Sequence, residues 1–259
     1  MSSLKNIIDT HSHYDDPRFD GDRYALVGSL FERGMSAIIH AATDLRSTMF
    51  GIKYAELFPR FYTAAGIHPE YAPKMLPAEL WEIEKLCRQK GKNKIVAVGE
   101  IGLDYHYPGY DRRAQIRLFR EQILLAIRCG LPVIVHSRDA SGDCVAILKE
   151  LRPKGVMHCF SGSSETAREL INIGMYISFT GVISFKNSKK ARAALEVVPP
   201  DRLLLETDCP YMAPEPLRGQ RCDSSMLVYT AAAEAAIRGV TAEQIILQTE
   251  KNARALFGI

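Results

Sequence analysis

The sequence predicts one domain with the TIM (β/α)8 barrel fold, in which β-strands alternate with α-helices. Eight short apolar segments recur along the 259 residues, and most are separated by a segment with helical spacing of apolar side chains. Six of these eight segments run into His, Glu or Asp at their carboxyl ends. In a barrel these ends converge on one face, whereas in a doubly wound open sheet they would spread along an edge. The polar strand ends therefore favour the barrel.

The predicted strands are continuous apolar runs, as expected for parallel strands buried on both faces. In chain order they comprise residues 6–9, 35–40, 61–68, 94–100, 132–136, 155–158, 174–180 and 202–208. The predicted helices carry apolar residues at the 3.6-residue period, and many are followed by Gly or Pro. They comprise residues 23–33, 48–57, 78–88, 114–129, 144–151, 165–173, 188–198, 226–238 and 242–257. No Gly/Ser linker or internal repeat divides the chain, so we expect a single domain over residues 1–259.

Composition excludes several classes of protein. Hydrophobic residues make up 47% and charged residues 24%, which is typical of a globular domain and not of a disordered chain. The net charge of +3 is too small for a protein that wraps nucleic acid by charge alone, so a polyanionic substrate would be recognised locally. The six cysteines form no CxxC pair, and no signal sequence or long apolar stretch is present. We therefore expect a cytoplasmic protein with reduced thiols and no membrane association.

The polar residues at the predicted strand ends suggest a metal centre. His11 and His13 are two residues apart, so in an extended segment both imidazoles point the same way and can hold one ion. Alone this motif is weak, because a single histidine at a strand end is more often hydrogen-bonded to the backbone. Further His and carboxylate residues each follow a different strand; they are Glu100, His136, His158 and Asp208. Burying these groups together without a cation would leave charges poorly compensated.

This set of side chains exceeds the three protein ligands typical of one catalytic zinc ion. Two divalent ions bridged by a carboxylate fit better, and Glu100 is the candidate bridge. Mixed His and carboxylate ligation suits Zn²⁺ or Mn²⁺, and Mg²⁺ with more water in its shell. Such a pair of ions activates water and polarises a phosphoryl or carbonyl oxygen, which predicts a hydrolase. Asp208 would bind a metal and accept the proton of the nucleophilic water, although it could instead cap the turn at Pro210.

Seven segments, distributed over essentially the whole chain, resemble the TatD family of metal-dependent deoxyribonucleases in the amidohydrolase superfamily. They are DTHSHYDD (9–16), GIHP (66–69), VGEIGLDYH (98–106), PVIVHSRDA (132–140), HCFSG (158–162), LLLETDCPYMAPEPLRG (203–219) and NARALFGI (252–259). The resemblance implies a TIM barrel with a two-metal site that hydrolyses phosphodiester bonds of DNA, often as a 3′–5′ exonuclease on single strands. It implies a DNA substrate, and nothing in the residues points to an obligate protein partner.

The resemblance also assigns roles to individual residues. One ion would be held by His11, His13 and Asp208, the other by His136 and His158, with Glu100 bridging them. His68, in GIHP, would lie at the edge of the site and contact substrate phosphate or a metal-bound water, unless it makes a structural hydrogen bond. Arg218 would contact phosphate, since a guanidinium pairs bidentately with phosphate oxygens.

The segment after Arg218-Gly219 departs from the family pattern. It reads QRCDSS where the family usually continues through a segment with Asn and then Pro, which puts the substrate contacts of this loop in doubt. An alternative function keeps the two metals but cleaves an amide, a lactone or an aminoacyl-tRNA ester, because one superfold serves several hydrolases. A non-catalytic binding protein would have lost metal ligands, yet the whole set is present. Cys159 follows His158 and is predicted to be a small core residue rather than a nucleophile.

Overall fold

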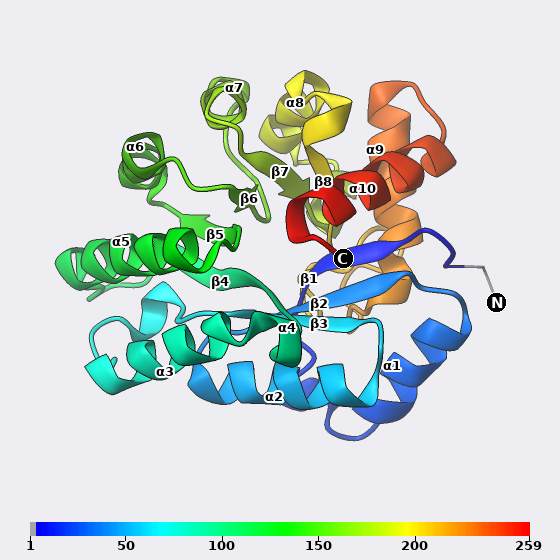
Figure 1. Cartoon of the computed structure of the whole chain (residues 1–259). Helices are drawn as coiled ribbons and strands as arrows, with labels where there is room; N and C mark the ends of the chain where they lie inside the picture. The colour runs from blue at the N-terminus through cyan, green and yellow to red at the C-terminus, as the bar shows by residue number, and fades with distance from the viewer. Residues whose placement is uncertain (1–3) are drawn as a thin grey trace.

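The computed structural model describes residues 4–259, and within them eight parallel strands form one sheet. The strands occur in sequential order from β1 to β8, so each pairs with its neighbour in the chain. A bridge between Ser12 and Cys209 and a hydrogen bond from the Thr10 hydroxyl to the Leu205 carbonyl (3.0 Å) join the first strand to the last. Figure 1 shows the strands at the centre with helices outside them. The fold is a nearly closed TIM barrel of one domain, which confirms the predicted fold class.

The strands are β1 (Ile8–Ser12), β2 (Ala37–Ala41), β3 (Phe61–Ala65), β4 (Ile95–Asp104), β5 (Val133–Arg138), β6 (Gly155–Met157), β7 (Tyr176–Phe179) and β8 (Leu203–Leu205). The helices are α1 (Arg23–Glu32), α2 (Leu45–Leu57), α3 (Pro77–Arg88), α4 (Lys90–Asn93), α5 (Arg112–Cys129), α6 (Ser141–Leu151), α7 (Ser164–Asn172), α8 (Lys189–Val197), α9 (Leu227–Arg238) and α10 (Ala242–Phe257). Short 3₁₀ helices are η1 (Pro17–Phe19), η2 (Pro69–Tyr71), η3 (Gly181–Ser184), η4 (Pro200–Arg202) and η5 (Ser224–Met226).

Some helices begin and end at residues that satisfy their free backbone groups. The Asp44 carboxylate accepts a hydrogen bond from the Ser47 N–H at the start of α2 (2.7 Å). Asp111 accepts one from the Ala114 N–H at the start of α5 (2.9 Å). That helix ends at Gly130, whose φ of 60° is the left-handed conformation that favours glycine. These local signals mark the start of α2 and both ends of α5.

Apolar side chains fill the inside of the barrel. A buried cluster contains side chains from nearly every strand, among them Ile39, Ile134 and Leu204. It also includes Ala253 and Phe257 of α10, so the last helix closes one end of the barrel. Polar residues are therefore concentrated at the other end, where the strands finish. Within residues 4–259, no helix combines the length and the apolarity that a membrane crossing requires.

The structure corrects several predicted boundaries. The first strand continues through Ser12 and the fourth through Asp104, so His11 and Glu100 lie within strands and do not follow them. The third strand ends at Ala65, and His68 lies beyond it at the start of η2. Helix α4 was not predicted, because its four residues, KGKN, carry no apolar periodicity. The spacing of apolar residues predicts which segments form strands and helices, but it predicts their ends poorly. The ends depend on hydrogen bonds to neighbouring elements.

Candidate metal centre

Glu100 lies at the centre of a histidine cluster, and its two carboxylate oxygens face different members of it. Oε2 lies 3.4 Å from Nε2 of His11 and 3.5 Å from Nε2 of His13. Oε1 lies 2.9 Å from Nδ1 of His136 and 2.8 Å from Nε2 of His158. The glutamate is 3% exposed, so these histidines are its main polar surroundings. This carboxylate therefore separates the cluster into two groups of nitrogen atoms.

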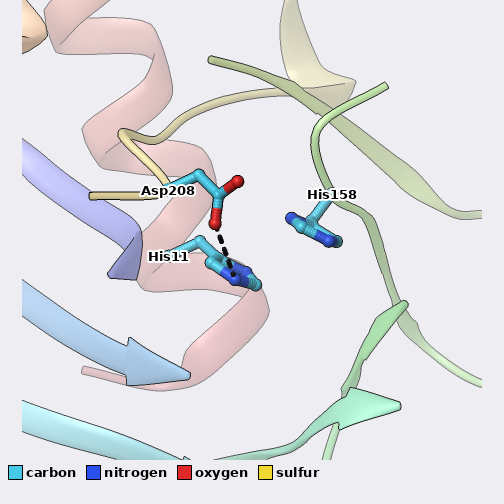
Figure 2. Close-up of side chains that lie close together, drawn as sticks. All are labelled: His11, His158 and Asp208. Carbon is cyan, nitrogen blue, oxygen red and sulfur yellow. Dashed lines mark ion pairs between the residues drawn. The ribbon is translucent and has the colours of Figure 1, made fainter. Parts of the chain in front are cut away.

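Asp208 completes the group on the Oε2 side of Glu100. Its Oδ1 lies 3.2 Å from Nε2 of His13 and 3.6 Å from Nε2 of His11. The two histidine nitrogens are themselves 3.0 Å apart. Figure 2 shows the carboxylate of Asp208 above the imidazole of His11, with His158 beside them. The rings of His11 and His158 are stacked with their centroids 4.0 Å apart, so the two groups of nitrogens are adjacent.

The group on the Oε1 side contains His136 and His158, whose Nδ1 and Nε2 atoms are 3.2 Å apart. His68 approaches the same carboxylate oxygen, with its Nε2 at 3.8 Å. Its Nδ1 accepts a hydrogen bond from the Glu70 N–H (3.3 Å), which fixes the ring at the start of η2. The ring therefore makes a structural hydrogen bond on one side and faces Glu100 on the other.

Local irregularities in two strands orient the central side chains. The register of β1 against β2 shifts between Asp9 and Ser12, and that of β4 against β5 shifts between Val98 and Ile101. His11 and Glu100 lie in these two irregular stretches. An irregularity of this kind bends a strand and turns a side chain away from strict alternation. Asp208 has a φ of 60°, a left-handed conformation that surrounding contacts must hold in place.

Two buried carboxylates outside the predicted set contact the histidines from behind. Asp104 Oδ2 lies 3.1 Å from Nε2 of His136. Glu206 Oε1 lies 3.6 Å from Nδ1 of His158. Both residues occur in motifs already noted in the sequence, VGEIGLDYH and LLLETD, but only the folded chain brings them to the histidines. Carboxylates in this position fix the orientation and tautomer of a metal-binding imidazole.

Burial and charge set the protonation states in the cluster. Burial raises the pKa of Glu100, but the nearby charges of His158 and His11 outweigh it and hold the pKa well below its usual range. Burial lowers the pKa of His68 to about 3. For His13, burial lowers the pKa, but the hydrogen bond to Asp208 and the charge of Glu100 raise it to about 9. An ionised carboxylate surrounded by histidines in this way can be compensated either by protons or by cations.

The spacing of these atoms suits divalent cations. In a tetrahedral site with bond lengths of about 2.1 Å, neighbouring ligand atoms are about 3.4 Å apart. The distances between the nitrogen and oxygen atoms described above, 2.8–3.8 Å, lie near this value. Among residues 4–259, Nδ1 of His11 is buried without a hydrogen-bond partner. In residues 4–259, three groups of side chains could each hold a cation: His11 with His158 and Asp208, His11 with His13 and Glu100, and His68 with Glu100 and His136.

The side chains of Arg218, of the nearby Arg221 and of Cys159 are not among the groups that face Glu100 in this cluster. Arg218 is largely exposed, and its guanidinium lies 4.3 Å from the centroid of the Phe185 ring. Arg221 donates hydrogen bonds to the Asp22 carboxylate (2.6 and 2.8 Å), so it ties the loop to the start of α1. The thiol of Cys159 lies 3.7 Å from the Thr180 hydroxyl, and burial raises its pKa to about 12. A thiol with this pKa is not a nucleophile at neutral pH.

Comparison with known proteins identifies a family. The family model described as TatD related DNase matches residues 8–258. The metal-dependent hydrolase YabD of Bacillus subtilis is 38% identical, with 98% of this chain and 99% of the relative covered. A 3′-5′ ssDNA/RNA exonuclease TatD from Enterobacter lignolyticus is 30% identical over 98% of this chain and 99% of the relative.

Solved structures give the same result. The crystal structure of the TatD homologue YjjV from Escherichia coli superposes with a TM-score of 0.91 at 32% identity, and 99% of each chain is covered. The match extends over the whole barrel and therefore includes the strand ends that carry the histidine cluster. Together with the family match, it shows that this chain belongs to the TatD family of metal-dependent hydrolases.

Proposed function

We propose that this protein is a two-metal phosphodiesterase that removes nucleotides from the 3′ end of single-stranded DNA. The observation that carries the proposal is the position of Glu100, whose two oxygens face two separate groups of histidines. A carboxylate placed in this way can bridge two ions a few ångströms apart. Paired ions of this kind are common in enzymes that cleave phosphodiesters.

In this proposal each ion has its own ligands. One would be held by His11, His13 and Asp208, whose nitrogen and oxygen atoms converge on the Oε2 side of Glu100. The other would be held on the Oε1 side by His136 and His158, whose nitrogen atoms face that oxygen. The donor set suits Zn²⁺ or Mn²⁺, and Mg²⁺ with additional water.

Divalent ions bound there supply polarisation of the phosphoryl oxygens and make a water molecule easier to deprotonate. Asp208 is the proton acceptor in this scheme. It faces His11 and His13 through Oδ1, and Figure 2 shows its other oxygen turned away from His11. Burial raises the pKa of Asp208, but the hydrogen bond with His13 and the charges of the neighbouring histidines lower it below the usual value. The carboxylate is therefore ionised at neutral pH and can take a proton from the attacking water.

Substrate contacts are proposed for His68 and Arg218. His68 lies beside Glu100 and its low pKa makes it neutral, so its imidazole can donate one hydrogen bond to a phosphate oxygen. Arg218 is exposed near Phe185, and its guanidinium can form two parallel hydrogen bonds with a phosphate further along the DNA strand. The choice of single-stranded DNA is supported by the family description and by the name of the Enterobacter lignolyticus relative.

The proposal is tested by nucleotide release from single-stranded DNA labelled at its 5′ end. The purified protein is assayed with Mg²⁺, Mn²⁺ or Zn²⁺, and in parallel with EDTA and with the Asp208→Ala variant. We expect stepwise shortening of the labelled strand that needs a metal and is absent from the variant. Metal content and the circular dichroism spectrum of the variant are measured to confirm that it is folded.

Two results would contradict the proposal. Shortening by Asp208→Ala at the wild-type rate would exclude Asp208 as the proton acceptor. No cleavage by wild-type protein that holds two ions would exclude the phosphodiester substrate, and an amide, a lactone or an aminoacyl-tRNA ester would be tested next. Inorganic phosphate distinguishes these classes, because it should compete with a phosphodiester at the site far more strongly than with an amide.

A further inference from the structure

A buried carboxylate connects the metal centre to the loop that follows the last strand. Asp9, on β1, is 0% exposed. Its Oδ1 accepts hydrogen bonds from the backbone N–H groups of Thr207 (3.0 Å) and His11 (3.3 Å). Its Oδ2 accepts from the hydroxyl groups of Thr207 (2.6 Å) and Ser224 (2.6 Å). Both oxygens of Asp9 are therefore fully used, and their donors come from three separate parts of the chain.

Ser224 is itself held in place by Tyr14. Its hydroxyl donates to Asp9 and lies 2.7 Å from the Tyr14 hydroxyl, which therefore donates to Ser224. The phenol oxygen in turn accepts the Ser224 backbone N–H (3.1 Å). All three side chains are completely buried. Hydrogen bonds to a buried carboxylate are short and strong, and removing one leaves an oxygen that water cannot satisfy.

These bonds fix the backbone from which three of the proposed metal ligands extend. The Asp208 N–H donates to the His11 carbonyl (2.9 Å), and the His13 N–H donates to the Cys209 carbonyl (2.8 Å). The two segments therefore form a short parallel ladder, and Asp9 joins them at its base through His11 and Thr207. The left-handed conformation of Asp208 persists only because contacts such as these hold it.

We infer that Ser224, acting through Asp9, is a positioning residue for one of the two metal ions, the one held by His11, His13 and Asp208. This inference rests on the proposed two-metal centre. It also gives a role to the segment in which the sequence departs from the family pattern, since Ser224 lies in QRCDSS. In the folded chain the Ser224 side chain turns inward to a strand that carries metal ligands.

The second group of ligands has supports of its own. Glu206, behind His158, accepts hydrogen bonds from the Ser178 hydroxyl (2.6 Å) and the Cys159 N–H (2.5 Å). His136 is contacted by Asp104. Asp104 lies on β4, whereas Glu206 follows β8 and directly precedes Thr207; within residues 4–259 neither carboxylate is hydrogen-bonded to Asp9 or Ser224. Loss of the Ser224 hydroxyl should therefore lower the binding affinity for the ion held by His11, His13 and Asp208 and leave the affinity for the other ion unchanged.

The test measures binding of Co²⁺ alone, without substrate, by titration calorimetry of the metal-free protein. We expect wild-type protein to bind two Co²⁺ ions. In Ser224→Ala, one of the two ions should bind about tenfold more weakly, which is the lower end of the range for loss of a residue that supports a metal ligand. The matched control is Ser225→Ala, because Ser225 is adjacent and only half-buried, and its hydroxyl makes no hydrogen bond within residues 4–259. Tyr14→Phe should lower the affinity for the same Co²⁺ ion by a smaller factor, because Ser224 keeps its hydrogen bond to Asp9.

Combining Ser224→Ala with a substitution of a ligand from either group identifies which ion is affected. In His136→Ala protein, which retains the first group of ligands, Ser224→Ala should still weaken the remaining ion about tenfold. In Asp208→Ala protein, which retains the second group, it should have no effect. Equal weakening of both ions, unchanged affinities, or the same loss in Ser225→Ala would overturn the inference. A wild type that binds fewer than two ions would instead contradict the two-metal centre, and the inference would fall with it.

Discussion

Asp104 Oδ2 lies 3.1 Å from Nε2 of His136, while the other nitrogen of that ring lies 2.9 Å from Glu100. The imidazole is therefore held between two carboxylates. If Nε2 carries the proton and donates it to Asp104, the lone pair of Nδ1 points to the centre of the cluster. This arrangement gives Asp104 a role in presenting His136 to a metal ion.

Asp104→Asn should weaken binding of the ion that we propose His136 and His158 hold by about 10–100-fold, because an amide can present its N–H to the ring and favour the wrong tautomer. Binding of the other ion should not change. Equilibrium dialysis against Mn²⁺ followed by elemental analysis measures both. The matched control is Asp139→Asn, which removes an exposed carboxylate paired with His106 at 2.8 Å. Equal affinities in Asp104→Asn and wild type would exclude this role.

Arg218→Ala should raise KM for single-stranded DNA several-fold and leave kcat and metal content nearly unchanged. The reason is that the exposed guanidinium lies over Phe185 and 4.0 Å from the Glu215 carboxylate, so its loss should remove the proposed phosphate contact without disturbing the proposed metal ligands. The rise in KM should shrink at high salt, where a charged contact is screened. Arg254→Ala is the control, since Arg254 pairs with Glu250 on α10. A fall in kcat alone would show that Arg218 acts on the chemical step.

Helix α2 packs against β3 so closely that Gly51 has no room for a side chain. A Cβ there would lie 2.7 Å from Cβ of Thr63 and 2.8 Å from the ring of His40. Gly51→Ala should therefore destabilise the protein by about 1–3 kcal/mol, although alanine favours helix by about 1 kcal/mol. Gly28→Ala in α1 is the control and should be neutral or stabilising, because its nearest neighbour would be Phe58 at 3.8 Å. Urea denaturation measures both, and equal midpoints would contradict the packing argument.

Glu234, on α9, is 0% exposed, and neither of its oxygens has a hydrogen-bond partner within residues 4–259. Burial raises its pKa well above 4.5; the charge of Arg238 on the same helix opposes this, and that of Glu206, beyond β8, adds to it. The native state thus holds this proton more tightly than the unfolded state. Stability from this group is complete below about pH 4.5 and decreases as the pH rises toward the native pKa.

Glu234→Gln should remove this pH dependence, because glutamine stays neutral. Relative to wild type, the variant should gain free energy of unfolding as the pH rises from 4.5 to 8. Urea denaturation of the metal-free proteins at both pH values measures the difference. If the difference in free energy of unfolding between the two proteins does not change with pH, Glu234 has an ordinary pKa.

Much of this architecture could be predicted from local patterns. The apolar runs and the helical periodicity gave all the strands of the barrel and most of its helices, because burial on two faces or on one stripe leaves a direct trace in the order of residues. Residue type and position at strand ends identified His11, Glu100 and Asp208 as candidates before any contact was known. The predicted ends of the strands were less accurate. Glu100 lies inside β4, and the pattern of apolar residues does not reveal the irregularity in that strand.

The sequence by itself determined the barrel, the family and the set of candidate ligands, because each depends on residues that are close in the chain or on motifs of fixed spacing. Tertiary structure alone decided which oxygen of Glu100 faces which histidines, and that Asp104 and Glu206 lie behind them. It also brought Ser224 to Asp9, 215 positions apart in the chain. Such contacts depend on strand register, local bulges and closure of the barrel, which only the packing of the whole chain sets.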